Sequence, residues 1–209
     1  MLRILIADDH AIVRKGLKQI LLEQYPAAII TETADAEALI MATINEKWDV
    51  VICDMSMPGR SGLAALQQIK QSSPQLPVLI MSMYPEDQYA LRVLKAGASG
   101  YLLKETIHDD IIKAIETVLI GKKFITASIA EKLANVFDRT ASQQLHETLS
   151  DREFDVMKLL SAGKSVTEIG EQLSLSTTTI STYRFRIMEK MNMRSNADLT
   201  RYALENGLI

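Results

Sequence analysis

The sequence has little cysteine and no long apolar run. Cys53 is the single cysteine among 209 residues, which excludes an internal disulfide and a cysteine-rich zinc site. No apolar segment reaches the length of a membrane-spanning helix. The apolar N-terminal segment ends at Asp8-Asp9 and is too short for a secretory signal peptide. We therefore expect a soluble, cytoplasmic protein with no membrane partner, in which Cys53 is a buried structural thiol.

A glycine-rich phosphate loop is absent as well. The tetrapeptide Ala7-Asp8-Asp9-His10 follows the first apolar segment. A nucleotide-binding protein would place glycines and helix N–H groups at this point. This absence counts against a nucleotide-dependent enzyme.

Excess positive charge is confined to one stretch. The net charge is −3, and residues 149–209 carry equal numbers of basic and acidic residues, eight of each. Within 176–194, however, Glu189 is the one acidic residue, and it stands among four basic ones, Arg184, Arg186, Lys190 and Arg194. Local positive charge inside a neutral domain is expected of an element that reads DNA.

The first 120 residues alternate expected strands with expected helices. The strands are predicted at residues 2–7, 28–33, 49–53, 77–82 and 100–103. Asp35 is expected to cap the second helix, and Thr106 to open a capping box before the fifth. Five βα units predict a flavodoxin-like α/β fold, with a parallel sheet in the order 2-1-3-4-5 and helices on both faces.

Polar residues follow these strands at one edge of the sheet. Asp8 and Asp9 follow the first strand, Asp54 ends the third, Ser82 ends the fourth, and Lys104 follows the fifth. The first and third strands flank the topological switch point, so the carboxylates should converge there. Three neighbouring carboxylates repel one another, and Mg²⁺ removes this repulsion because it prefers oxygen ligands. The sequence therefore predicts a site for Mg²⁺ and a phosphate.

Asp54 is the candidate nucleophile of this site. A carboxylate can form an aspartyl phosphate, while Mg²⁺ neutralises the charge on the moving phosphoryl group. Lys104 can pair with a phosphate oxygen, and the Ser82 hydroxyl can hydrogen-bond to one. Each residue alone also fits a simpler role: Asp54 as a turn residue, Asp9 as a helix cap, Lys104 as a solvated lysine. Their combination at one sheet edge is more specific than any member.

Residues 1–120 resemble the receiver domain of two-component response regulators. The resemblance rests on Asp8-Asp9, Asp54, Met57-Pro58-Gly59, Ser82, Tyr101 and Lys104, in this order. It implies a phosphoryl donor, either a histidine kinase or a small phosphodonor. It also implies a Mg²⁺ site made of three carboxylates and one backbone carbonyl: Asp8, Asp9, Asp54 and Ser56.

The resemblance also gives roles to two residues that are ambiguous alone. Ser82 and Tyr101 would couple phosphorylation to the surface formed by the fourth helix, fifth strand and fifth helix. Without the resemblance, Tyr101 would be interpreted as an aromatic residue packed at the edge of the sheet. Glu105 departs from the family pattern, in which proline often follows the lysine. This departure does not affect the chemistry.

Residues 121–147 are interpreted as a linker that contains a helix. Apolar residues at helical spacing predict this helix at Ser128–Asp138, followed by a polar, flexible tether over Arg139–His146. His146 and His108 are expected to be exposed and inert. His10 lies beside the acidic pocket and could support its residues, but the favoured interpretation is a helix-start residue.

Residues 148–209 are expected to form a separate all-α domain of four helices. Ser150–Glu153 and Ser165–Glu168 both fit a capping box. A longer helix is predicted from Thr177 to about residue 192, and Asn196 is expected to cap a last one. Two short helices, a tight turn and a longer basic helix indicate a helix-turn-helix.

The longer helix is the candidate DNA reader. Small hydroxyl side chains allow close approach to base edges and phosphates, and the basic residues can contact phosphates. The predicted DNA contacts are Lys164, Thr178, Thr179, Ser181, Thr182, Arg184 and Arg186. The simpler alternative is an ordinary amphipathic helix with a solvated basic side.

This second region is similar to the LuxR-type helix-turn-helix, on the segments 149–153, 163–170 and 175–187. A receiver joined to such a domain is the layout of NarL/FixJ response regulators. The resemblance implies sequence-specific binding of double-stranded DNA as a homodimer, with the last helix near the dimer contact. Ser181 stands where the family often has lysine, which shifts the expected phosphate contacts toward Arg184, Arg186 and Lys164.

The resulting hypothesis is a phosphorylation-controlled transcription regulator that is not an enzyme with its own substrate. An aspartyl phosphate at Asp54 would shift the receiver toward a state that promotes dimerisation and DNA binding. The alternative is a Mg²⁺-dependent phosphatase or hydrolase on a flavodoxin-like sheet, which would need a second acid or base and a substrate pocket. A third reading is a metal-insensitive receiver that acts by protein contact alone.

Overall fold

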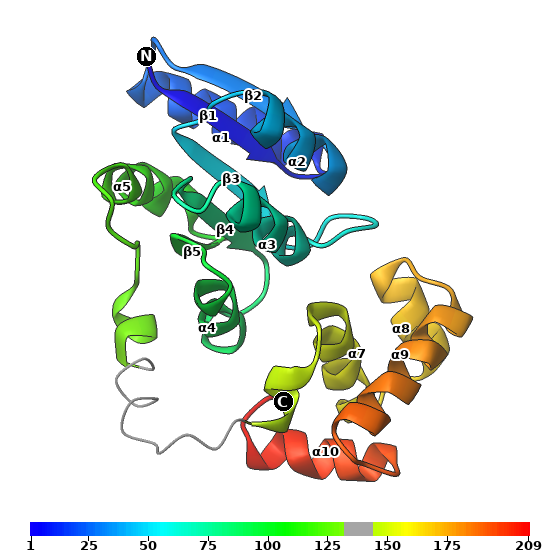
Figure 1. The fold of residues 1–209 in the computed structure, drawn as a ribbon. Helices are drawn as coiled ribbons and strands as arrows, with labels where there is room; N and C mark the ends of the chain where they lie inside the picture. Colours follow the sequence, from blue (N-terminus) through cyan, green and yellow to red (C-terminus); the bar gives the residue numbers. More distant parts are fainter. Residues whose placement is uncertain (132–143) are drawn as a thin grey trace. The chain divides into compact units, whose positions relative to one another are not determined.

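The computed structural model describes residues 1–131 and 144–209. The chain divides into two compact units, Met1–Thr140 and Ala141–Ile209 (Figure 1). Residues 127–131 are helical, in agreement with the start of the helix expected at Ser128–Asp138. The rest of that helix, and most of the tether predicted after it, lie outside the described residues.

The first unit is built on a parallel sheet of five strands in the order β2-β1-β3-β4-β5. The predicted fold class and strand order are therefore confirmed. The register pairs Ala7 with Cys53, and Ser82 with Leu103. The carboxyl ends of the strands consequently meet at one edge. The strands are β1 (Arg3–Ala7), β2 (Ile29–Thr33), β3 (Val50–Asp54), β4 (Val78–Ser82) and β5 (Gly100–Leu103).

Helices cover both faces of this sheet, and every residue of β3 and β4 is buried. Strands buried on both faces read as continuous apolar runs, which explains why the sequence marked them so clearly. α1 and α5 share one core cluster with the central strands, and α2 packs beside α3. The helices are α1 (Ala11–Gln24), α2 (Ala36–Asn45), α3 (Gly62–Ser72), α4 (Glu86–Lys95) and α5 (Ile107–Leu119).

The helix starts of this unit follow the sequence with one exception. Asp35 accepts a hydrogen bond from the Ala38 N–H at 2.7 Å and caps α2 as expected. α5 does begin after Thr106, but the capping box expected there is wrong, because the Thr106 side chain makes no cap bond. Thr106 has φ −112° and ψ 8°, which is not the extended backbone of a capping residue. Its hydroxyl donates instead to Asp110 at 3.5 Å.

The second unit is all helix. The capping boxes predicted at Ser150 and Ser165 are both present. The last helix is capped by Ser195, which pairs with Asp198, so the expectation that Asn196 is the cap is wrong by one residue. The described elements are η1 (Leu145–Thr148), α7 (Asp151–Ser161), α8 (Val166–Leu173), α9 (Thr177–Lys190) and α10 (Asn196–Glu205). Among the helices that the structure describes, none combines the length and the apolar character needed to cross a membrane.

His146 is buried, whereas the sequence predicted an exposed, inert residue. It is 9% exposed, and its Nδ1 lies 2.9 Å from the Tyr202 hydroxyl. Its ring also packs against Phe154, with 5.7 Å between centroids. The short 3-10 helix η1 turns this part of the chain into the core of the second unit. A polar segment without an apolar period carries no sequence signal for such a turn.

Gly62, at the start of α3, gives the first test of the fold. A Cβ at this position would lie 1.9 Å from the Asp54 carbonyl oxygen. Gly62→Ala is therefore expected to lower the free energy of unfolding by about 3 kcal/mol, measured by urea denaturation. The matched control is Gly16→Ala within α1, where an added Cβ meets no atom within 4 Å. This control should raise stability by about 0.5–1 kcal/mol. Equal stability of both variants would contradict the close approach of α3 to Asp54.

Candidate functional site

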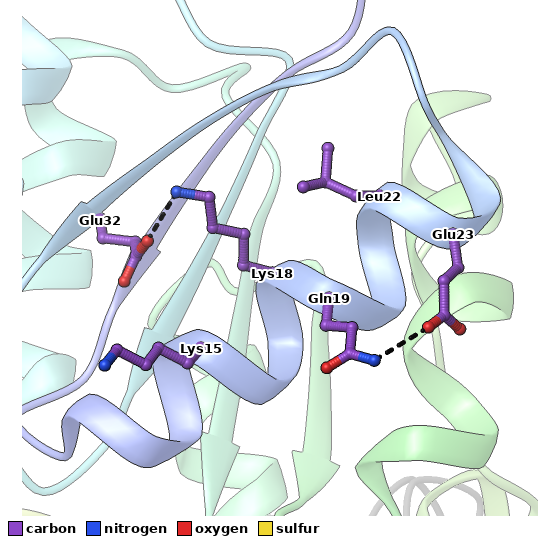
Figure 2. A pocket seen from close by; sticks show the side chains of 6 residues that line it. All are labelled: Lys15, Lys18, Gln19, Leu22, Glu23 and Glu32. Atoms are coloured by element: carbon purple, nitrogen blue, oxygen red, sulfur yellow. Dashed lines mark hydrogen bonds and ion pairs between the residues drawn. The ribbon is translucent and has the colours of Figure 1, made fainter.

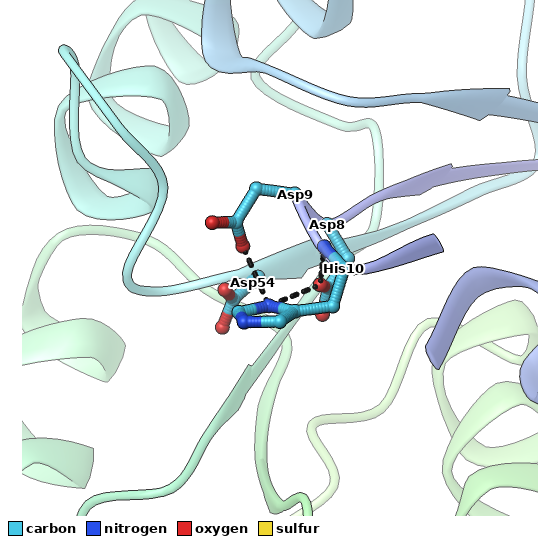
Figure 3. Close-up of side chains that lie close together, drawn as sticks. All are labelled: Asp8, Asp9, His10 and Asp54. Carbon is cyan, nitrogen blue, oxygen red and sulfur yellow. Dashed lines mark hydrogen bonds and ion pairs between the residues drawn. The ribbon is translucent and has the colours of Figure 1, made fainter. Parts of the chain in front are cut away.

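The carboxylates predicted at the sheet edge lie together. Asp8 follows β1 directly, and Asp54 is the last residue of β3. One ligand atom each from Asp8, Asp9, His10 and Asp54 lies within 4.8 Å of all the others (Figure 3). Asp8 and Asp54 are almost completely buried, so their charges are poorly screened by water.

Lys104 supplies positive charge to this cluster. Its Nζ lies 2.7 Å from Asp8 Oδ2 and 3.0 Å from Asp54 Oδ1. Burial alone would lower the pKa of Lys104, but the hydrogen bond to Asp8 and the charge of Asp54 outweigh it and raise the pKa. Lys104 therefore stays protonated. The β4–β5 pairing holds it in place, because its N–H donates to the Ser82 carbonyl at 2.8 Å.

Burial destabilises the ionised form of the Asp54 carboxyl group. Burial raises the pKa of Asp54, while the charge and hydrogen bond of Lys104 and the N–H of Ser56 lower it in part. Its Oδ2 is buried and has no hydrogen-bond partner among the residues that the structure describes. The three carboxylates thus lie beside one ammonium, which pairs with Asp8 and Asp54, and one oxygen of Asp54 is left unsatisfied. This donor set fits a hard divalent cation.

His10 also belongs to this cluster, although the sequence gave little indication of it. It occupies the N-cap position of α1, as expected, but makes no side-chain cap bond. Its Nδ1 lies 2.8 Å from Asp9 Oδ1 and 3.2 Å from Asp8 Oδ1, and its N–H donates to Asp8 at 2.7 Å. The only signal in the sequence is its position directly after the acidic pair.

Ser82 and Tyr101 are joined through the backbone of Tyr84. The Ser82 hydroxyl oxygen accepts from the Tyr84 N–H at 3.0 Å, and the Tyr101 hydroxyl donates to the Tyr84 carbonyl at 2.8 Å. Both Ser82 and Tyr101 are 1% exposed. The loop between β4 and α4 therefore links the Ser82 side chain, at the carboxyl end of β4, to an aromatic ring on β5. The sequence alone did not show the part played by Tyr84.

Cys53 is a buried free thiol, which confirms the predicted burial. It donates to the Asp54 carbonyl at 3.2 Å. Burial, followed by the negative charges of Asp54 and Asp8, raises its pKa. A thiol of this kind stays protonated and unreactive.

α1 also borders a hollow of about 570 Å³ that is separate from the acidic cluster (Figure 2). Lys18 pairs with Glu32 there at 2.9 Å, and Gln19 donates to Glu23 at 3.2 Å. None of the predicted site residues lines it. Apart from Lys15, the charged and polar residues that line the hollow are therefore paired with one another.

In the second unit, α8 and α9 are joined by a tight turn. Ser174 adopts a left-handed conformation with φ 55°. A Cβ at Gly170 would lie 2.7 Å from the Leu175 carbonyl oxygen, so the turn packs directly on α8. Ile180 and Ile187 are fully buried on the inner side of α9. This is the arrangement of a helix-turn-helix.

The predicted DNA contacts on α9 separate into two groups. Thr179 belongs to the start of the helix, since its hydroxyl lies 2.8 Å from that of the cap residue Ser176. The other five are exposed along α9: Thr178, Ser181, Thr182, Arg184 and Arg186.

Lys164 lies near two of the contacts predicted on α9. It lines one hollow of about 240 Å³ together with Ser181, Arg184 and Asn196. Arg184 Nε donates to Asn196 Oδ1 at 2.9 Å. Asn196, taken from the sequence as a cap, thus orients the guanidinium.

Two family assignments cover most of the chain. Residues 4–116 match the family described as the response regulator receiver domain. Residues 147–203 match the family described as bacterial regulatory proteins of the luxR family. The chain is a NarL/FixJ-family response regulator. Both resemblances seen in the sequence are thereby confirmed, and the response regulator is a DNA-binding regulator of transcription.

Relatives match this response regulator over its full length. The response regulator UvrY of Escherichia coli strain K12 is 32% identical over 209 residues, which are 100% of this chain and 96% of UvrY. The oxygen regulatory protein NreC of Staphylococcus carnosus is 35% identical over 215 residues, with 100% of this chain and 99% of NreC covered.

Solved structures agree with this assignment. RcsB from Salmonella enterica serovar Typhimurium, bound to promoter rprA in the presence of the phosphomimetic BeF₃⁻, is similar with a TM-score of 0.58 and 30% identity. The match covers 97% of the response regulator and 98% of that chain. An RcsB–DNA complex has a TM-score of 0.59 and 31% identity, with 96% of each chain covered.

The buried charge of Asp54 has a consequence for the stability of the metal-free response regulator. Its pKa is raised by burial, so the folded protein holds this proton more tightly than the unfolded chain. Wild-type stability should therefore fall as the pH rises through the pKa of Asp54. Asp54→Asn should raise the melting temperature near neutral pH, because Lys104 keeps its pairing with Asp8 at 2.7 Å.

The measurement is a series of thermal melts in a chelating buffer between pH of about 4 and 8. The advantage of Asp54→Asn should shrink as the pH falls, because the wild-type carboxyl becomes protonated, first in the folded state and then in the unfolded chain. Asp109→Asn, a change at an exposed residue of α5, is the control and should have no such effect. A wild type that is more stable than Asp54→Asn at every pH would contradict the predicted effect of burial.

Proposed function

We propose that this response regulator stores a signal as an aspartyl phosphate on Asp54 and converts it into DNA binding. The observation that carries this proposal is the buried, unpartnered Oδ2 of Asp54 beside two further carboxylates and the Lys104 ammonium. A sensor histidine kinase is the partner that supplies the phosphoryl group, as family membership implies. The family assignment also favours this function over a hydrolase that turns over a substrate.

Each residue of the cluster has a distinct role in phosphoryl transfer. Asp8, Asp9, Asp54 and the Ser56 carbonyl would hold Mg²⁺. When bound, Mg²⁺ neutralises charge on the transferred group. The Asp54 carboxylate attacks phosphorus, and the bond from phosphorus to the donor breaks. Lys104 pairs with a phosphoryl oxygen.

Ser82 provides the route from phosphorylation to the rest of the receiver. Its hydroxyl can donate to a phosphoryl oxygen, which would change its present contact with the Tyr84 N–H. The same peptide segment accepts from Tyr101. A shift of this loop would therefore change the packing of Tyr101, and the receiver would move toward its DNA-binding state.

The output is sequence-specific binding of double-stranded DNA by a homodimer in the cytoplasm. We assign residues 1–120 to the receiver, 121–147 to the linker and 148–209 to the DNA-binding domain. α9 would enter the major groove, as the second helix of this motif does. Its exposed hydroxyls would approach bases and phosphates, and Lys164, Arg184 and Arg186 would contact phosphates.

Phosphoryl labelling tests the acceptor. Asp54→Asn is expected to abolish labelling by acetyl phosphate with Mg²⁺, measured by intact-protein mass spectrometry, because an amide cannot form the acyl phosphate. Asp109→Asn should label like the wild type, since Asp109 lies exposed on α5. Unchanged stoichiometry of label on Asp54→Asn would assign the acceptor elsewhere.

A DNA-binding measurement tests whether α9 contacts the duplex. Arg184→Ala should weaken binding of a target duplex and reduce the slope of log affinity against log salt by about two, because the homodimer loses one phosphate contact in each half-site. Lys47→Ala removes one positive charge from an exposed position between α2 and β3 and serves as the control. Wild-type affinity and salt slope in Arg184→Ala would show that Arg184 makes no phosphate contact.

A further inference from the structure

Phe185 lies in the middle of the exposed side of α9. Its side chain is 69% exposed, whereas Phe124 and Phe154 are buried. Single exposed apolar residues are common on protein surfaces, so exposure alone does not distinguish Phe185. Its position on the helix does.

Helix geometry places Phe185 opposite the buried seam. Ile180 and Ile187, on the inner side of α9, and the C-cap residue Met191 are at most 1% exposed. With 3.6 residues per turn, Phe185 is rotated by about 140° from Ile180 around the helix axis. Ser181 lies one turn before Phe185 on the same face. The helix therefore directs the phenyl ring away from the rest of the domain.

The neighbours of Phe185 toward the start of α9 are short, and their hydroxyl donors are in use, whereas the exposed Glu189 lies one turn beyond Phe185 on this face. The Ser181 hydroxyl donates to the Thr177 carbonyl at 2.9 Å, and the Thr182 hydroxyl donates to the Thr178 carbonyl at 3.0 Å. These side chains present methyl or methylene groups and acceptor oxygens outward. The phenyl ring extends beyond them, so the centre of the face is apolar.

Positive charge beside Phe185 indicates which macromolecule this apolar centre meets. Arg184 and Arg186 are its neighbours in sequence, and both are exposed. Asn196 holds the Arg184 guanidinium at 2.9 Å. Cations at the border of an apolar ring match a DNA groove, with phosphates at its edges and bases at its floor. They do not match an apolar protein surface.

The apolar group that a base edge offers in the major groove is the C5-methyl group of thymine. We propose that Phe185 is a specificity-determining residue, which packs against a thymine methyl group in the binding site. This inference rests on the proposed DNA-binding function and goes beyond it, because it names the base and the chemical group that are read. The predicted hydroxyl and arginine contacts would position α9, while Phe185 selects thymine.

The test removes the methyl group without changing base pairing. Full-length protein, treated with acetyl phosphate and Mg²⁺, is used to select binding sites from a randomised duplex library. Each thymine in one half-site of the selected duplex is then replaced in turn by deoxyuridine. At one position this change should weaken wild-type binding about fourfold, the factor that corresponds to losing the burial of one methyl group.

Two variants complete the measurement. Phe185→Ala should bind the thymine duplex more weakly and lose the difference between thymine and deoxyuridine at that position. Arg186→Ala, the matched control, should weaken binding to both duplexes by the same factor and keep the difference. Phe185 is exposed, so melting temperatures of Phe185→Ala and wild type should agree, which separates a contact effect from unfolding.

Several results would overturn the proposal. One is the absence of any thymine position at which deoxyuridine weakens wild-type binding. Another is that Phe185→Ala keeps the wild-type ratio of the affinities for the thymine and deoxyuridine duplexes. Phe185 would then not contact the methyl group, and a protein partner would be the alternative occupant of this face. Either of these results would leave the DNA-binding function standing. If the wild type selected no sequence at all, the sequence-specific function would fail, and with it the role of Phe185.

Discussion

The contact of the Lys104 ammonium with Asp8 and Asp54, at 2.7 and 3.0 Å, is the interaction on which the receiver site depends. Without it, two nearly buried carboxylates would face each other in a medium that screens charge poorly. Lys104 reduces this repulsion but does not remove it, since Asp9 adds a third charge and Asp54 Oδ2 has no partner among the described residues. The remaining negative charge makes the site receptive to a divalent cation, and through it to a phosphoryl group.

The same interaction connects the site to the sheet. Lys104 follows β5, and its N–H is bonded to Ser82 at the end of β4. Because Lys104 contacts Asp54, a change of charge on Asp54 would affect both β4 and β5 through Lys104. Tyr84 extends this connection, because its peptide groups contact both Ser82 and Tyr101. Side chains held in a close-packed interior shift between discrete arrangements rather than by gradual deformation. A chain of this kind is suited to a two-state response.

Much of the fold and of the acidic cluster was predictable, because buried parallel strands read as apolar runs and their last residues share one edge. The predictions that failed depended on tertiary contacts, or on which of two adjacent residues caps a helix. Ser195 and Asn196 both suit a cap, and the pairing with Asp198 decides for Ser195. His146 is buried through contacts with Phe154 and Tyr202, both distant in sequence. The close approach of α3 to Asp54 was equally invisible, because glycine at a helix start has no distinctive pattern.

Polar links to α7 and α10 hold α9, and they affect how it can read DNA. Near its carboxyl end, Lys190 Nζ lies 2.6 Å from Glu153, which also completes the capping box of α7. Burial tends to raise the pKa of Glu153, but the bonds from Lys190 and Ser150 outweigh it and lower the pKa. The Arg184–Asn196 bond ties the middle of α9 to α10. A helix fixed in this way presents its outer face with little freedom to rotate, which a short-range contact between one ring and one methyl group requires.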